Sequence, residues 1–275
     1  MKPDGSLILN SDDPLVLEAK ESSKKKTVTY GSDENTADVL FSNTSIVYED
    51  NNGINVPIGV SFKVSYGGNV VPITLPGVLG VQHTYPVAAA IAVGLSQDVP
   101  FLNMTNSLAN HETPKGRMNI VPGINNSVII DDSYNAAPIA MQKAVEVLGE
   151  IETKGNKIAV LGDMLEIGSF SASEHKKIGK QVAESGVSFL VAVGVRSEYI
   201  AVEAIKNGMN EDKVVYLKTS EEAAEYVKDI IKEGSVILVK GSQGIRTEKV
   251  VVSIMADKTK RKELLVRQEE AWESR

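Results

Sequence analysis

The sequence predicts an α/β protein in which a Rossmann-like parallel sheet forms the later part of the chain. From about residue 156, short apolar runs alternate with helical patterns, as they do in β-α-β units. Gly186, Gly208 and Gly234 each follow one of the helical patterns, where helices commonly end. Residues 219–222 have the spacing of a capping box. These features predict parallel strands joined by helices.

The first ~150 residues predict a smaller set of hairpins and helices. Residues 27–75 are rich in Val, Thr, Ser, Asn and Tyr, and Gly67-Gly68-Asn69 supplies a turn between two alternating runs. A helix is predicted from Tyr85 to Leu95, with a proline in its first turn. Residues 107–110 predict a short helix or loop, and 138–150 an amphipathic helix.

The later part has a regular pattern. Strands are predicted over 157–162, 189–194, 213–217 and 235–240, and helices over 173–185, 197–207 and 220–232. No Gly-x-Gly-x-x-Gly follows the first of these strands, so a dinucleotide oxidoreductase is not predicted. The charged end of the chain, residues 259–275, is either an extra helix or a frayed tail.

Composition narrows the class of protein. The 275 residues are 42% hydrophobic, carry a formal net charge of −7 and include no cysteine. Disulfides, cysteine-ligated zinc and thiol catalysis are therefore excluded. The negative charge argues against nucleic acid as the main partner, and no apolar run reaches the ~18 residues of a membrane helix. Because no signal-peptide pattern opens the chain, we expect a cytoplasmic protein with no membrane partner.

Three predicted strands run directly into polar side chains. The stretches 128–138, 158–168 and 236–249 each begin as a buried strand. The first two continue with carboxylates, and the third continues with Lys240 and Arg246. Open α/β sheets bind ligands at the carboxyl ends of their strands, and such groups suit phosphate and carboxylate chemistry. For the first stretch alone, a strand followed by a helix cap is the alternative.

Taken in order, these stretches resemble the Mur ligases. The motifs are Asp-Asp-Ser-Tyr-Asn-Ala-x-Pro at 131–138, Leu-Gly-Asp-Met-Leu-Glu-x-Gly at 161–168 and Lys-Gly-Ser-x-Gly-x-Arg-x-Glu-Lys at 240–249. Asn-x-Asp-Asp-Pro at 10–14 and Gly-Arg at 116–117 add to the likeness. The resemblance is nearest to the subfamily that adds D-Ala-D-Ala to a UDP-linked tripeptide.

The resemblance implies a domain organisation. We expect a remnant of the Mur ligase central ATPase domain over residues 1–152, the Rossmann-like C-terminal domain over 153–258, and a charged tail over 259–275. The boundary is placed at the polar run 150–156, where the pattern changes. The chain contains no Gly-x-x-x-x-Gly-Lys-Ser/Thr, the P-loop that cradles ATP phosphates. We expect that loop and the UDP-sugar domain to lie outside this chain.

On the nucleotide side the resemblance implies roles for four residues. Arg117 would contact the ATP phosphates, with a surface salt bridge as the alternative. Asp132 would accept hydrogen bonds from the ribose, and Asn135 lies beside it or caps the next helix. His83 falls where the family has an asparagine near the adenine, and glutamine replaces the family's histidine at position 82. Together with Gln243, which stands where arginine is common, these changes depart from the family pattern.

On the substrate side the resemblance implies a second group. Asp163 and Glu166 would face the incoming amine and hold or deprotonate it. Lys240, at the end of its predicted strand, matches the family's Lys-Gly-Ser turn, suits a substrate carboxylate or the acyl phosphate, and is expected to be catalytic. His175 matches a histidine of the subfamily, and an exposed position on a helix is the alternative.

The Gly/Ser-rich turn after the last strand completes the set. Ser242 and Arg246 suit a substrate carboxylate or an acyl phosphate. Glu248 and Lys249 are interpreted as an exposed pair.

The resemblance implies ATP-dependent formation of an amide bond. ATP would phosphorylate the carboxylate of a UDP-N-acetylmuramoyl peptide, and the amine of D-Ala-D-Ala would displace phosphate from the acyl phosphate, with Mg²⁺ neutralising charge. No metal site is predicted within the chain itself. Two alternatives stay open: a non-catalytic relative that binds a wall precursor, or one half of a split ligase whose N-terminal half is a separate partner.

Overall fold

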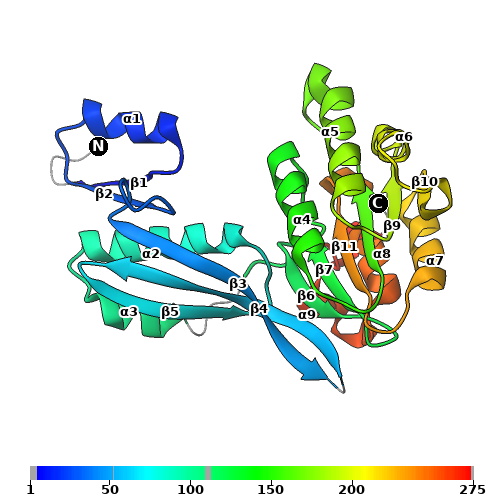
Figure 1. Ribbon diagram of the computed structural model, residues 1–275, viewed down its shortest axis with the longest axis horizontal. Coiled ribbons are helices and arrows are strands. Elements are labelled where there is room, and N and C mark those ends of the chain that lie inside the picture. Colours follow the sequence, from blue (N-terminus) through cyan, green and yellow to red (C-terminus); the bar gives the residue numbers. More distant parts are fainter. Residues whose placement is uncertain (1–4, 52, 109–112, 274–275) are drawn as a thin grey trace. The chain divides into compact units, whose positions relative to one another are not determined.

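The computed structural model describes residues 5–51, 53–108 and 113–273, which form two compact units (Figure 1). The N-terminal unit comprises Met1–Val47, Gly59–Pro76 and Gly80–Glu112. The C-terminal unit comprises Tyr48–Ile58, Gly77–Leu79 and Thr113–Arg275. None of the described helices has both the length and the apolar character needed to cross a bilayer.

The N-terminal unit is built on a five-stranded sheet with the order β1-β2-β3-β4-β5. β1 pairs with β2 and β2 with β3 in parallel, whereas β4 and β5 are antiparallel. The far ends of β3 and β4 belong to the C-terminal unit. The strands are β1 (Leu7–Asn10), β2 (Thr27–Gly31), β3 (Val39–Asn51), β4 (Ile54–Tyr66) and β5 (Asn69–Pro76). The helices are α1 (Pro14–Ser22), α2 (Thr84–Ser96) and α3 (Phe101–Ser107).

The predicted hairpin of this unit is confirmed as β4 and β5. Gly67 and Gly68 have φ angles of 56° and 80°, which a two-residue hairpin turn requires and glycine adopts without strain. Val60, Phe62 and Val64 alternate along β4 and are at most 1% exposed. Phe62 stands opposite Ile73 of β5, so every second side chain of the hairpin enters the core.

The segment Asn10-Ser11-Asp12-Asp13-Pro14 explains a helix that the sequence did not predict. Asp13 caps α1 by accepting the backbone N–H groups of Leu15 and Val16, and Pro14 opens the helix. The Asp12 carboxylate accepts the hydroxyl of Tyr85 at 2.8 Å. Burial and this contact raise the pKa of Tyr85 to about 12. This motif therefore ties β1 to the start of α2.

The C-terminal unit is a six-stranded sheet with the order β10-β9-β8-β11-β7-β6. Five strands are parallel, and β6 is antiparallel to β7 at one edge. The strands are β6 (Asn119–Pro122), β7 (Val128–Asp132), β8 (Lys157–Gly162), β9 (Phe189–Val193), β10 (Val214–Leu217) and β11 (Val236–Lys240). From β8 the chain proceeds to β9 and β10 on one side and returns to β11 on the other. The predicted Rossmann-like sheet is confirmed, with its switch point between β8 and β11.

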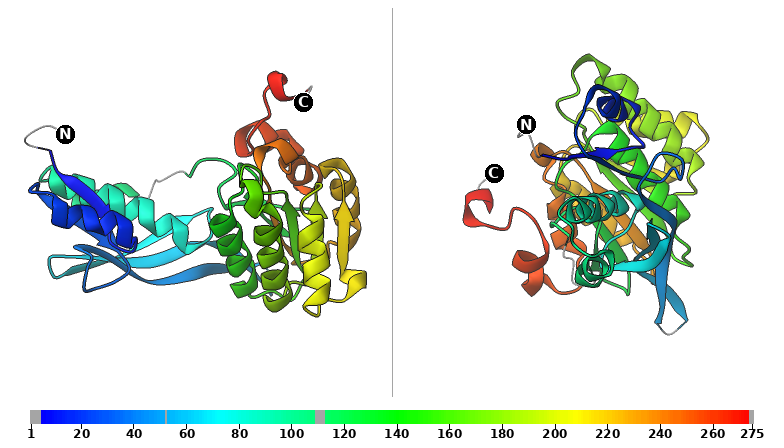
Figure 2. Two further views of the ribbon diagram at one scale, coloured as in Figure 1. Left: turned by 90° about the horizontal axis from the view of Figure 1, so that it is seen from above. Right: turned by 90° about the vertical axis from the view of Figure 1, so that its left-hand side faces the viewer.

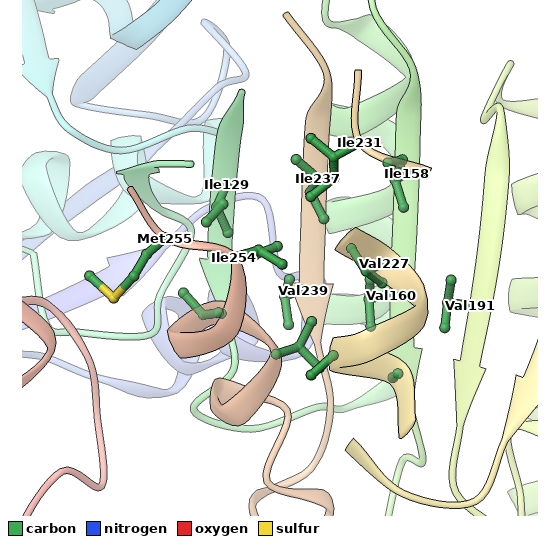
Figure 3. Close-up of a cluster of buried hydrophobic side chains, with 14 of the residues drawn as sticks. Ile129, Ile158, Val160, Val191, Val227, Ile231, Ile237, Val239, Ile254 and Met255 are labelled. Atoms are coloured by element: carbon green, nitrogen blue, oxygen red, sulfur yellow. The ribbon is translucent and has the colours of Figure 1, made fainter. Parts of the chain in front are cut away.

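Helices cover both faces of this sheet, α4, α5 and α6 on one and α7 and α8 on the other (Figures 1 and 2). They are α4 (Pro138–Glu150), α5 (Ser171–Glu184), α6 (Glu198–Lys206), α7 (Ser220–Ile230) and α8 (Glu248–Ile254). Figure 3 shows Ile129, Val160 and Val239 of the sheet meeting Val227 of α7 and Ile254 of α8. Because both faces are packed, the central strands are buried along their whole length.

Short-range sequence patterns correctly predicted most helices and strands of the C-terminal unit. α4 occupies the predicted range 138–150, and β8 the predicted range 157–162. The capping box at the start of α7 is formed, with Thr219 and Glu222 each accepting the other's backbone N–H. Short β6 and α8 were not predicted.

The structure divides the chain elsewhere than at the expected boundary of 152/153. β6, β7 and α4 lie in the C-terminal unit, because β7 pairs with β11. The run 150–156 is also fixed within this unit. Thr153 donates its hydroxyl to the carbonyl of Gly234, and Asn156 donates its side-chain amide to the carbonyl of Ile230 at 3.0 Å. A polar run in the sequence does not distinguish such a hydrogen-bonded connection from a linker.

The charged end of the chain is ordered as far as it is described. It contains the short helices α9 (Arg261–Leu264) and α10 (Glu270–Glu273). Between them Leu265 is 2% and Arg267 7% exposed. Of the two alternatives, extra helical structure is therefore confirmed over the described residues.

Candidate functional site

The polar residues selected from the sequence gather at the carboxyl edge of the six-stranded sheet. Lys240, the last residue of β11, is in register with Asp132 on β7 and with Leu161 on β8. The loops after β7, β8 and β11 therefore leave the sheet side by side, at its switch point.

A buried ion pair lies at the centre of this edge. The Nζ of Lys240 is 2.6 Å from Oδ2 of Asp132 and donates a second hydrogen bond to the carbonyl of Asn135 at 2.9 Å. Lys240 is 1% and Asp132 5% exposed. Burial raises the pKa of Asp132, whereas the charges of Lys240 and, more weakly, Arg117 lower it. The structure thus joins a residue predicted for the substrate side to one predicted for the nucleotide side.

Asp131 is a second buried carboxyl group on the same strand. It is fully buried, and its Oδ1 accepts the backbone N–H of Ser133 at 3.2 Å. Burial raises its pKa to about 6, hydrogen bonding from Ser133 opposes the rise, and the charges of Asp132 and Glu248 add to it. The edge therefore holds a carboxyl group that titrates near neutrality.

Arg117 and Asn135 lie on the exposed side of the same loops. The guanidinium of Arg117 lies 4.3 Å from the centre of the Tyr134 ring. This cation–π contact replaces the salt bridge considered as an alternative. Asn135 is exposed, and its side chain accepts the backbone N–H of Ala136 at 2.9 Å. The capping role considered for it is wrong, because the N-cap of α4 is Ala137 and no side chain of the described residues caps this helix. Both side chains are accessible at the edge.

Asp163 has a structural role in the loop after β9. Its Oδ1 accepts the backbone N–H groups of Arg196 and Ser197 at 2.9 and 2.7 Å, and it is 2% exposed. Its predicted role toward an incoming amine would therefore be indirect. The same loop carries Arg196, which sequence reasoning missed. Its half-exposed guanidinium lies 3.7 Å from Oδ2 of Asp163.

His175 and Ser242 hold the loop after β8. The Nδ1–H of His175 donates to the carbonyl of Ser171 at 2.7 Å, and its Nε2 accepts the backbone N–H of Met164 at 3.0 Å. This pairing assigns the neutral tautomer, and burial lowers the pKa of the imidazole. The exposed position considered for His175 is wrong, since the side chain is fully buried.

Ser242 joins three loops. Its hydroxyl accepts the N–H of Leu165 at 2.9 Å and donates to the carbonyl of Ala136 at 3.3 Å. Its own N–H donates to the carbonyl of Asp163 at 2.9 Å. It is 3% exposed, so contact with substrate through this hydroxyl would need the loops to part.

Glu166 is the exposed carboxylate of the edge. Its backbone has a φ of 62°, which is uncommon for a residue with a side chain and is often found at functional sites. Within the described chain its carboxylate makes no hydrogen bond or ion pair. Close by in sequence lies an apolar hollow of about 430 Å³, lined by Ala137, Pro138, Ile139, Ile167, Phe170 and Glu174.

Arg246 is held by groups that sequence reasoning missed. Its Nε donates to Glu248, and its Nη1 donates to the carbonyl of Trp272 at 3.0 Å. Glu248 also accepts Nη1 of Arg267 at 3.3 Å. The interpretation of Glu248 as exposed is wrong, because it is fully buried. No local pattern marks Arg267 or Trp272, since both lie in what reads as a charged tail.

His83 belongs to the N-terminal unit. It precedes α2 and is 9% exposed. Across the described residues, no cluster of three or more His, Asp or Glu side chains is arranged to hold a metal ion.

Comparison with known proteins agrees with this arrangement. Residues 116–243 match the family model "Mur ligase, glutamate ligase domain". The UDP-N-acetylmuramoyl-tripeptide–D-alanyl-D-alanine ligase of Bacillus subtilis (strain 168) is 27% identical over 255 residues, covering 93% of this chain and 52% of that enzyme. In sequence and in fold the chain resembles the Mur ligases. The matched range of the family model opens at Gly116-Arg117 and includes β7, in accord with the unit boundary seen in the structure.

Other Mur ligases show the same similarity. The enzyme of the same name from Rickettsia prowazekii (strain Madrid E) is 32% identical over 144 residues, covering 52% of this chain and 31% of that enzyme. A crystal structure of MurF from Acinetobacter baumannii has a TM-score of 0.76 and 26% identity, over 94% of this chain and 53% of that one. MurF from Thermotoga maritima in complex with ADP, at 21% identity, shares the fold with a TM-score of 0.71 over 92% of this chain and 53% of that one. This chain thus spans about half the length of the relatives it matches.

Proposed function

We propose that this Mur ligase chain takes part in adding D-Ala-D-Ala to UDP-N-acetylmuramoyl-tripeptide through an ATP-dependent reaction. The observation that carries the proposal is the carboxyl edge, where three family motifs meet around Lys240 and Asp132. The names of the B. subtilis and R. prowazekii relatives support this substrate pair. This chain spans about half the length of those enzymes. We therefore assign the reaction to an assembly of this chain with the region of those enzymes that this chain does not match.

The nucleotide side of the proposed site comprises Arg117, Asp132 and Asn135. The exposed guanidinium of Arg117 suits a phosphate group, and the ADP in the T. maritima structure supports a nucleotide at this fold. Asp132 already accepts Lys240, and a carboxylate has acceptor capacity for a further donor such as a ribose hydroxyl. We infer that these residues complete a nucleotide site rather than form it alone, since the chain has no P-loop. Use of ATP implies a cytoplasmic location.

The substrate side of the proposed site comprises Glu166 and Arg246. The exposed carboxylate of Glu166 suits the ammonium group of the incoming dipeptide, and the apolar hollow lined by the next residue, Ile167, suits methyl side chains. Arg246 suits a carboxylate or an acyl phosphate once it exchanges its contact with the Trp272 carbonyl. Lys240 would act mainly by neutralising Asp132 within the edge. Asp163, His175 and Ser242 would support the site by fixing its loops.

Mg²⁺ is implied by the family chemistry. The described residues form no three-ligand acidic cluster, so we infer that the ion would enter with ATP and take protein ligands outside this chain. When bound it would neutralise charge on the transferring phosphoryl group.

The test is reconstitution of the assembly. The part of the B. subtilis relative that this chain does not match would be fused to it or co-expressed with it, and phosphate release would be followed with the UDP-linked tripeptide, ATP and D-Ala-D-Ala. Release that depends on the dipeptide is expected. Arg117→Ala should raise the KM for ATP on the order of tenfold or more, since it removes a charge-assisted hydrogen bond. The control Lys143→Ala removes an exposed lysine of α4 and should leave that KM unchanged.

The substrate side needs its own variant. Glu166→Gln removes the charge and keeps the shape of the side chain, so it should raise the KM for D-Ala-D-Ala and leave the KM for ATP unchanged. If the folded assembly binds nucleotide and releases no phosphate, the ligase proposal is wrong. The departures at Gln82, His83 and Gln243 would then favour a non-catalytic protein that binds a wall precursor.

A further inference from the structure

The segment after α8 reaches back to the loops that carry the proposed nucleotide site. Arg267, in this segment, is 7% exposed. Its Nη1 donates to the carbonyl of Ser133 at 3.1 Å, and its Nη2 donates to the carbonyl of Tyr134. These carbonyls directly follow Asp132, so one guanidinium from 134 residues away satisfies the backbone where the chain leaves β7.

The same guanidinium reaches the turn after β11. Its Nη1 lies 3.3 Å from Oε2 of Glu248, whose other oxygen accepts Nε of Arg246. Glu248 is fully buried, so it holds the two guanidinium groups in a shielded environment. The loop after β7 and the turn after β11 are therefore coupled through one carboxylate and one guanidinium.

Backbone geometry gives a second and independent observation. Arg267 and Arg246 both adopt left-handed conformations, with φ angles of 58° and 63°. Residues with side chains rarely adopt them, and such strain persists only where the surroundings fix the backbone firmly. The Trp272 ring lies 5.2 Å from the Arg246 guanidinium and 5.7 Å from that of Arg267. The segment is thus fitted to these two arginines.

We propose that Arg267 is a positioning residue for the nucleotide side of the site. It acts by fixing the carbonyls of Ser133 and Tyr134. Fixing this backbone sets the direction of the neighbouring Asp132 and Asn135 side chains. It also sets the position of the Tyr134 ring, against which the Arg117 guanidinium lies. The planar fork of arginine can reach two carbonyls and a carboxylate together, whereas the single ammonium of lysine cannot do so in this geometry. The inference rests on the proposed function, because it assumes that nucleotide binds at this loop.

The experiment measures ADP binding to the reconstituted assembly by calorimetry. Arg267→Ala is expected to raise the Kd for ADP on the order of tenfold, and Arg267→Lys is expected to restore little of the affinity. Val227→Ala is the matched control, because it opens a cavity in the core at α7, away from these loops, and lowers the melting temperature. Its Kd for ADP should equal that of the wild type.

A readout on the chain alone checks the contact itself. Trp272 is the single tryptophan, and both arginines lie against its ring, so Arg267→Ala should shift its fluorescence emission and Val227→Ala should not. An unchanged emission would count against the contact.

Each outcome of the binding measurement decides the inference. Equal Kd values for wild type and Arg267→Ala overturn it. Alternatively, the Kd for ADP of Arg267→Ala and of Val227→Ala rises equally when the two variants lose the same amount of melting temperature. That result would show that Arg267 has only a structural role, and it would also overturn the inference. Tighter binding by Arg267→Ala would also overturn it, because the segment would then hinder nucleotide binding. If the wild-type assembly binds ADP without ligase activity, the proposed function falls and the Kd values still decide the role of Arg267. If it binds no ADP, both fall.

Discussion

The buried carboxyl group of Asp131 should make the stability of the chain depend on pH in a direction opposite to that of most carboxylates. Its pKa is raised from the ordinary 3.8 to about 6 in the folded chain. The folded state therefore binds this proton more tightly than the unfolded state. Below the ordinary pKa both states are protonated and the group imposes no penalty. As pH rises through about 6, the folded state loses up to about 3 kcal/mol relative to the unfolded one.

The change that tests this is Asp131→Asn, which keeps the acceptor for Ser133 N–H and removes the ionisable group. The free energy of unfolding of variant and wild type is measured by denaturant titration across a range of pH. The difference, variant minus wild type, should rise by about 2 kcal/mol between about pH 4.5 and 7.5, the part of the total that falls in this window. Titrating groups that do not interact with Asp131 cancel in the difference.

The control is Glu184→Gln, which alters an exposed carboxylate on α5 in the same unit. Its difference from wild type should stay flat, because an exposed group interacts alike with water in both states. A difference for Asp131→Asn that is flat, or that falls as pH rises, would refute the reasoning. The absolute offset between variant and wild type does not enter the test, since an asparagine amide placed in the same buried site carries its own cost.

Three further predictions concern contacts that hold the edge. Lys240→Ala should lower the free energy of unfolding by about 3–5 kcal/mol by leaving Asp132 buried without its partner, and the double variant with Asp132→Ala should recover part of it. Denaturant titration of the cycle checks this, and additive losses would contradict it. His175→Ala should cost about 1–3 kcal/mol by orphaning the N–H of Met164. This cost, the difference from wild type, should shrink as pH drops below 6.5, because the pKa of His175 is lowered in the folded chain. Denaturant titrations of variant and wild type over pH would show a constant difference if the imidazole were exposed. Thr219→Ala should cost about 1 kcal/mol through loss of the helix cap, whereas Thr219→Ser should cost little.

The fold could be predicted where the signal is local. The range of α4, the strand β8 and the capping box at Thr219 follow from periodicity and spacing within a few residues. The order of strands could not be predicted in the same way. β7 and β11 pair across more than a hundred residues, and the only trace in the sequence is that both are apolar runs ending in charge. For this reason the expected boundary at 152/153 differs from the division of the chain into two units.

The sequence predicted where the candidate residues would gather, but not which groups they would contact. The motifs marked residues that gather at one edge of the sheet, because polar residues after buried strands meet at the carboxyl edge of any parallel sheet. The partners of each side chain had no sequence signal. Asp163 binds the N–H groups of Arg196 and Ser197, which any residue types would offer. Arg267 lies in a run of charges that resembles a solvated tail, and only packing reveals that its guanidinium is buried.

The position of β11 has a consequence for how the C-terminal unit forms. Both of its neighbours, β7 and β8, precede it in the chain, so neither can complete its hydrogen bonds until residue 240 is available. During synthesis the hairpin of β6 and β7 and the array of β8, β9 and β10 would each present an open, apolar edge. Insertion of β11 closes both edges in one step and brings Lys240 to Asp132 at the same moment. Completion of the sheet and assembly of the charged edge are therefore a single late event, and a slow one, because it depends on contacts distant in sequence.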